Sequence, residues 1–291
     1  MLILSILASI IIWSFLYGWK FALILVGSIF IHEYGHFYWM GREGIKNKDM
    51  FFIPPFGAIA RVKEMWPSRG AESRISLAGP AFGLISLLMF AFFWVLSRSA
   101  LFLASMVLAS YINLFNLLFP VPIMDGGRVV KSILFSFSNR LGKSFYLLGL
   151  ALLAFLALTS RTNPFLVILI GYMLWSEYTS LLSAEKALLQ ITNSIEQTEQ
   201  TESALRQNGL DKFVDSITEL KLTSLGFSSI DEMKKRKEGL ELLLNPPPMD
   251  KKEIATSILL FIAIARIYIF SISFIGNSMD INLRALPGYF K

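Results

Sequence analysis

The sequence predicts an all-α polytopic membrane protein with about six to seven transmembrane helices. Three observations lead to this fold class. The first two are that 54% of the 291 residues are hydrophobic and that only 16% are charged. A third is that several apolar stretches approach the roughly 20 residues that a helix needs to cross a bilayer. The same composition argues against a free water-soluble domain. Because the chain has no cysteine, disulfide scaffolds, thiolate zinc sites and cysteine nucleophiles are excluded.

Seven apolar stretches are expected to form the membrane helices. The first is interpreted as a retained helix rather than a secretory signal, because it lacks a basic start and a small-residue cleavage site. The fifth is short for a full span. In chain order the expected spans are 1–17, 21–40, 75–96, 100–119, 145–159, 164–182 and 254–275.

The net charge of +6 indicates an orientation in the membrane. Residues 41–74 hold seven Lys or Arg, and residues 128–143 hold four and no acid. The positive-inside rule places both loops in the cytoplasm, so we expect no nucleic-acid partner. The polar segment 184–253 has ten basic and thirteen acidic residues, so it adds nothing to the positive net charge. It is predicted to be helical, with Ser229 and Glu232 spaced as a capping box.

The only two histidines lie four residues apart in the second expected span, as His32-Glu33-Tyr34-Gly35-His36. On a helix this spacing puts both imidazoles on one face, where they can reach one metal ion, with Glu33 beside a bound water. This is the His-Glu-x-x-His pattern of zincins. Ionisable groups inside a span are costly, so their clustering indicates a functional site. The alternative is a histidine pair bonded to neighbouring spans, with Glu33 reaching toward the membrane surface.

A catalytic zinc site usually has three protein ligands and an open position for water. Since no further histidine or cysteine exists, the third ligand must be a carboxylate, and the acids next to expected spans are Asp125, Glu177 and Asp280. Asp125 is favoured because it follows the fourth span, on the side where the second span ends, in a turn rich in proline and glycine. A helix-capping aspartate is the alternative. We assign no role to Glu177 or to Arg266 in the last span.

Four motifs, in order, resemble the bacterial type of the site-2 protease family of intramembrane zinc metalloproteases. The resemblance covers roughly residues 21–130. The motifs are His32 to His36, the loop Phe52-Ile53-Pro54-Pro55-Phe56-Gly57-Ala58, the triplet Ala78-Gly79-Pro80, and Pro120-x-Pro122-x-x-Asp125-Gly126-Gly127.

The resemblance implies one Zn²⁺ per chain, held by the family's two histidines and aspartate, with the glutamate as catalytic acid/base. It also implies a three-helix metalloprotease core and a loop that dips into the membrane beside the site, where irregular backbone is tolerated only against protein or water. In this chain the implied ligands are His32, His36 and Asp125, and the implied catalytic residue is Glu33. The residues expected to position substrate are Asn116, Pro55, Phe56 and Gly57.

The chain departs from the family pattern at one position. The family usually has an asparagine eight residues before the aspartate, where this chain has Leu117, with Asn116 one position earlier. On a regular helix this shift turns the side chain by about 100°. Asn116 is kept as the substrate-positioning residue, with Asn113 also close to the site.

The expected domain organisation follows from the spans and the motifs. It comprises a first transmembrane helix (1–20), the intramembrane metalloprotease core (21–130), two additional transmembrane helices (131–183), a cytoplasmic helical segment (184–253), and a C-terminal transmembrane helix with a short tail (254–291).

The expected function is hydrolysis of peptide bonds in or near transmembrane segments of membrane-anchored substrates, as in regulated intramembrane proteolysis. The enzyme would be multi-pass in the cell membrane, in contact with the lipid bilayer, with its active site toward the cytoplasm. A membrane-embedded protein or peptide would unwind and pair with the loop edge at Phe52 to Ala60, so Ile59→Pro should impair cleavage and spare zinc. Two alternatives stay open: a metal-dependent membrane hydrolase that processes a peptide leader or signal remnant, and a non-cleaving membrane binding protein of the same fold.

Overall fold

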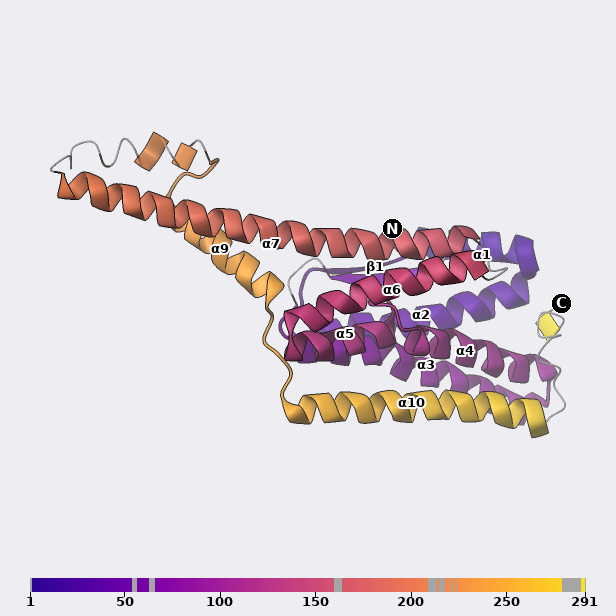
Figure 1. Cartoon of the computed structure of the whole chain (residues 1–291). Coiled ribbons are helices and arrows are strands. Elements are labelled where there is room, and N and C mark those ends of the chain that lie inside the picture. The colour runs from indigo at the N-terminus through magenta and orange to yellow at the C-terminus, as the bar shows by residue number, and fades with distance from the viewer. Residues whose placement is uncertain are drawn as a thin grey trace. The chain divides into compact units, whose positions relative to one another are not determined.

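The computed structural model describes residues 2–53, 57–62, 66–159, 164–208, 214, 218–220, 222–223, 225–278 and 289–290. The described chain is mostly helical, which confirms the all-α polytopic class, with one two-stranded hairpin added (Figure 1). The elements are α1 (Leu2–Tyr17), α2 (Trp19–Arg42), β1 (Lys48–Ile53), β2 (Gly57–Val62), α3 (Arg69–Ser97), α4 (Ala100–Leu118), α5 (Asp125–Phe137), α6 (Asn139–Thr159), α7 (Pro164–Gln207), α9 (Ile230–Leu244) and α10 (Lys251–Ser278).

Five helices among the described residues are long and apolar enough to cross a membrane: α3, α4, α6, α7 and α10. Helix α1 is apolar but has only 16 residues. Helix α2 has 24 residues, and its mean hydropathy is lowered by the His-Glu-x-x-His group that the sequence places inside it. The chain is therefore a multi-pass membrane protein by the length and composition of its helices.

The chain divides into two compact units, Met1–Ile168 with Pro247–Lys291, and Leu169–Pro246. In the first unit, α3 packs against α2, α4 and α5, and α10 packs against α3 and α4 (Figure 1). A buried apolar cluster joins four helices, with Leu77 from α3, Leu117 from α4, Val129 from α5 and Tyr268 from α10. This cluster holds α4 and α5 against α3, and α2 packs against α3 outside the cluster.

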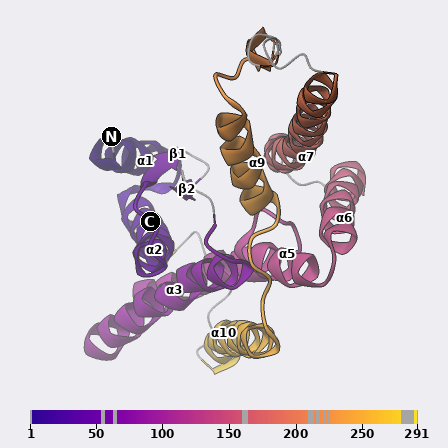
Figure 2. The same cartoon turned by 90° about the vertical axis from the view of Figure 1, so that its left-hand side faces the viewer.

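The hairpin occupies the loop that the sequence predicts to dip into the membrane. Strands β1 and β2 are antiparallel, with Ile53 opposite Gly57 and Lys48 opposite Val62. The strands lie beside α1 and α2 (Figure 2), and the Phe52 N–H donates to Ser5 Oγ of α1 at 3.1 Å. The predicted positioning residues Pro55 and Phe56 lie outside the described residues.

Most of residues 128–143, which the sequence predicts to be a basic loop, are helical and belong to α5 and to the start of α6. Lys131 of α5 is buried, and Lys131 Nζ lies 2.6 Å from Glu72 Oε1 of α3. Glu72 Oε2 accepts a hydrogen bond from Ser132 Oγ at 3.0 Å and lies 3.3 Å from Arg69 Nη1. A buried ion pair thus joins α3 to α5, and Lys131 is a structural residue rather than a solvated cytoplasmic charge.

The second unit contains most of α7 together with α9. Ile191 and Ile195 of α7 form an apolar cluster with Leu222 and with Met233 of α9. Helix α9 begins as predicted, since Ser229 Oγ accepts a hydrogen bond from the Glu232 N–H at 3.1 Å. The carboxylate of Glu232 accepts from the Ser228 N–H, one residue before the position that a capping box uses.

Candidate metal centre

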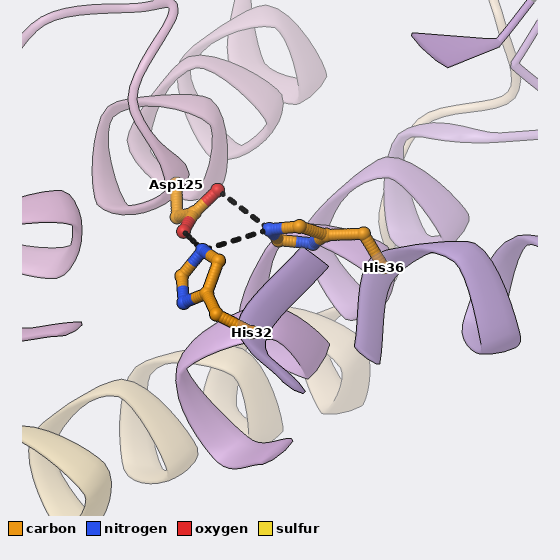
Figure 3. A group of neighbouring side chains, drawn as sticks. All are labelled: His32, His36 and Asp125. Atoms are coloured by element: carbon orange, nitrogen blue, oxygen red, sulfur yellow. Dashed lines mark hydrogen bonds and ion pairs between the residues drawn. The ribbon is translucent and has the colours of Figure 1, made fainter. Parts of the chain in front are cut away.

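The structure brings together the three side chains that the sequence predicts as metal ligands. His32 and His36 project from one face of α2, and Asp125 is the first residue of α5 (Figure 3). All three residues are buried. Their ligand atoms converge: His32 Nε2 lies 3.0 Å from Asp125 Oδ2, His36 Nε2 lies 3.2 Å from Asp125 Oδ1, and the two Nε2 atoms are 3.2 Å apart.

The other nitrogen of each imidazole is held by an acceptor. His32 Nδ1 lies 2.8 Å from Asn113 Oδ1, and the Asn113 amide donates to the Ala109 carbonyl, which orients its oxygen toward the histidine. His36 Nδ1 lies 2.7 Å from the carbonyl oxygen of Ile75. An oxygen acceptor requires the proton on Nδ1, so both neutral imidazoles present the Nε2 lone pair to the centre.

This donor set fits a metal ion. Two Nε2 lone pairs and a carboxylate face one another, an arrangement that repels itself unless a cation lies between the three groups or a proton is taken up. Tetrahedral zinc with bonds of about 2.0–2.1 Å separates its ligands by about 3.3 Å, close to the 3.0 to 3.2 Å found here. Hydrogen bonds from Nδ1 to a side-chain amide and to a backbone carbonyl are the usual support of metal-bound histidines.

Gly79 provides the room for both imidazoles. A Cβ at this position would overlap His36 Nε2 and would lie 2.9 Å from His32 Nε2. Gly35, between the two histidines, lies equally close to α3, because its Cβ would meet the Ala78 carbonyl oxygen and Phe82. Two glycines therefore let α2 and α3 approach closely enough for the ligands to lie against α3.

Two further glycines, directly after Asp125, let the start of α5 lie close to the end of α4. A Cβ on Gly126 would overlap the carbonyl oxygen of Leu117, and one on Gly127 would overlap that of Val121. The paired glycines thus pack the start of α5 onto the end of α4. Together with the Glu72–Lys131 ion pair, this packing fixes where Asp125 faces α2.

Glu33 connects α2 to the hairpin. Its Oε2 accepts a hydrogen bond from the Ala60 N–H of β2 at 2.8 Å. The Ala60 N–H therefore points away from β1. In an antiparallel ladder, successive N–H groups of one strand point alternately toward the partner strand and away from it. The Ala58 N–H is thus also directed outward, and Ile59 bonds to its partner Phe51. The outer edge of β2 therefore faces the residue predicted to be the catalytic acid/base.

The structure separates the two asparagines of α4. Asn113 is fully buried against His32, whereas Asn116 is half-buried, and its role in positioning substrate stays a prediction. Gly57, another predicted positioning residue, starts β2 with φ of 120°, a conformation open to glycine. Sequence reasoning noted Asn113 only as a neighbour of the site, and it missed the Ile75 carbonyl, since a backbone acceptor has no sequence signature.

Comparisons with known proteins give two matches by sequence. The family model of peptidase family M50 matches residues 20–100. A zinc metalloprotease of Methanocaldococcus jannaschii is 32% identical over 136 residues, which are 45% of this chain and 38% of that relative. The match thus spans well under half of the relative's length. No solved structure matches the chain significantly.

Proposed function

We propose that this chain is an intramembrane zinc metalloendopeptidase of the site-2 protease family, as its motifs predict and as the match of residues 20–100 to the model of peptidase family M50 supports. Its substrates would be membrane-anchored proteins or peptides, cut in or near a transmembrane segment during regulated intramembrane proteolysis. His32, His36 and Asp125 would hold one Zn²⁺, and Glu33 would be the acid/base.

The observation that carries the proposal is the convergence of three buried ligand atoms with both Nδ1 atoms bonded to oxygen acceptors. When bound, zinc would lower the pKa of a water toward 7 and polarise the scissile carbonyl. Glu33 would take a proton from the attacking water and return it to the leaving nitrogen.

The outer edge of β2 is the proposed docking place for substrate. An intact helix keeps its carbonyls in hydrogen bonds, so the substrate has to unwind before its peptide bonds can react. An extended segment can add to a free strand edge through main-chain hydrogen bonds. The edge of β2 suits this role because its Ala60 N–H already points to Glu33.

The site is proposed to open toward the cytoplasm. His36 and His32 lie six and ten residues before the end of α2 at Arg42, which is about 9 and 15 Å along the helix. The ligands would thus lie within the membrane, near enough to one surface for water to reach them. The side follows from the positive-inside rule applied to residues 41–74, and the cell membrane is the proposed location.

The test compares the wild-type chain with Glu33→Gln, purified in detergent, on candidate single-span substrates. We expect cleavage to be lost in Glu33→Gln while zinc per chain is retained. Glu43→Gln, which removes a carboxylate just after the same helix, serves as the matched control and should cleave normally. Equal cleavage by wild type and Glu33→Gln would overturn the assignment of Glu33.

Proline substitutions test the docking edge. Ile59→Pro, suggested by the sequence, removes an N–H that the ladder directs to β1, so it also disturbs the hairpin. Ala58→Pro removes only an outward N–H and leaves the Glu33–Ala60 bond in place. We expect Ala58→Pro to slow cleavage with zinc content unchanged. Unaltered cleavage of a membrane substrate by Ala58→Pro would refute pairing along β2.

A further inference from the structure

Helix α10 attaches to the rest of its unit through one face. Ile264, Ala265 and Tyr268 are buried in the main apolar cluster, and the Tyr268 hydroxyl donates to the Pro80 carbonyl at 2.7 Å. Ser257 and Ser271, on the same side, bond to Ser73 of α3 and Ser110 of α4. Figure 2 views α10 close to its axis, with α3 and α5 to one side of it.

Arg266 lies on the opposite side of this helix. At about 100° per residue it points roughly 170° away from the mean direction of the buried residues. Its neighbours on that side are exposed and apolar, including Leu259 at 67%, Ile262 at 43% and Phe270 at 68% exposure. We call Leu259, Ile262, Ala263, Arg266 and Phe270 the Arg266 face.

If α10 is centred in the bilayer, the depth of Arg266 keeps its side chain from water. It is the only charged residue between Ile254 and Gly276. The centre of α10, which runs from Lys251 to Ser278, lies only about 2 Å from it along the axis. The nearer edge of a hydrocarbon layer about 30 Å thick is then about 13 Å away. This is farther than an extended arginine side chain reaches, so snorkelling does not solvate the guanidinium.

The described residues of its own unit supply no counter-charge for this guanidinium. Arg266 forms no hydrogen bond or ion pair with any described residue of its own unit, Met1–Ile168 with Pro247–Lys291. Three acids that lie in apolar stretches have other partners: Glu33 binds the Ala60 N–H, Glu72 binds Lys131, and Glu177 is also engaged. A cation exposed at mid-membrane is costly unless a polar or charged partner covers it.

We propose that the Arg266 face is the docking surface for a transmembrane helix of another membrane protein, one that carries an Asp or Glu near the middle of the bilayer. The carboxylate pairs with the guanidinium, and Leu259, Ile262 and Phe270 pack around the pair. A second copy of this chain fits less well, because symmetric pairing of two α10 helices sets two Arg266 side chains against each other. The surface is separate from the metal ligands, so a partner can occupy it without covering them.

The test uses the full chain in phosphatidylcholine vesicles and a labelled polyleucine transmembrane peptide with one central Asp. Binding is measured by energy transfer, and the same peptide with a central Leu is the reference. We expect the wild-type chain to bind the Asp peptide about tenfold more tightly than the Leu peptide. Arg266→Leu and Arg266→Gln should lose the difference, and Arg266→Lys should keep part of it.

Lys251→Leu is the matched control, since it removes a cation from the end of the same helix and should keep the full preference. Zinc content and thermal unfolding of the Arg266 variants should equal those of the wild type, because the side chain contacts no described polar group. Equal binding of both peptides by the wild type, or an Asp preference that persists in Arg266→Leu, overturns the proposal. Energy transfer between two labelled copies that Arg266→Leu abolishes would assign the surface to self-association instead and overturn the partner.

Discussion

Replacing Gly79 by alanine should destroy the metal centre while leaving the membrane fold in place. The added Cβ would overlap His36 Nε2 and would lie 2.9 Å from His32 Nε2, against at least 3.4 Å for ordinary contact. Each imidazole must therefore retreat by about 0.5 Å or more, since a packed interior offers little slack. Metal–ligand distances tolerate only about 0.2 Å, so both ligands leave their binding positions at once.

The size of the effect can be bounded. Loss of one supporting hydrogen bond behind a ligand already costs about 10- to 100-fold in metal affinity. Displacing two ligands should cost at least about 100-fold, which corresponds to about 2.7 kcal/mol. The overpacking itself should lower the free energy of unfolding of the metal-free chain by about 1–3 kcal/mol.

The assay is zinc affinity by competition with a chelator in detergent, alongside thermal unfolding with and without zinc. Gly27→Ala is the matched control, because Gly27 is also on a helix and a Cβ there meets nothing within 4 Å. Gly27→Ala should bind zinc as the wild type does and gain about 0.5–1 kcal/mol of helix stability. Wild-type zinc affinity in Gly79→Ala would refute the close approach of α3 to the two histidines.

Three further predictions concern the surroundings of the site. Asn113→Leu removes the acceptor for His32 Nδ1 and should lower zinc affinity about 10- to 100-fold in a chelator competition, whereas Asn116→Leu should not. Lys131→Met leaves the buried Glu72 carboxylate without its closest cation and should lower the free energy of unfolding by about 3–5 kcal/mol; Glu72→Leu added to it should restore much of the loss. The pKa of Glu43 is lowered from 4.5 by hydrogen bonds from Arg74, so its stabilising contribution is present above about pH 4.5 and is lost as the pH falls through the lowered folded-state pKa. The thermal midpoint of Glu43→Gln should depend less on pH in that acidic range; an unchanged pH profile would contradict this.

The convergence of His32, His36 and Asp125 could be predicted because their positions follow from local rules. Two histidines four residues apart share a helix face, and the absence of cysteine and further histidine requires a carboxylate as the third ligand. The Gly-Gly pair after Asp125 also has a local cause, the close contact of the backbone with Leu117 and Val121. The histidine pair and the Gly-Gly pair are informative because few other local environments in a membrane protein require these residues.

Other features depend on long-range packing, which the sequence does not display. The pattern of residues 48–62 alternates too weakly to identify a hairpin, and residues 54–56, between the two strands, lie outside the described residues. The positive-inside rule includes Lys131 as a topology signal because a basic residue in a loop is usually solvated, yet Lys131 pairs with Glu72, 59 residues earlier. The cytoplasmic orientation therefore stays a prediction that rests mainly on residues 41–74.

The hydrogen bond between Glu33 and the Ala60 N–H fixes the position of Glu33 along strand β2. In the proposed reaction, a substrate strand aligned on β2 would present its peptide bonds to Glu33 at intervals of about 3.4 Å. The register of pairing, rather than a side-chain pocket, would then decide which bond is cut. Shifting the strand by one residue would move the cut to the neighbouring bond and turn every side chain to the opposite face. The position of a cleavage site would therefore depend on the number of residues between it and the point where the substrate is held on β2, and the sequence around the site could vary.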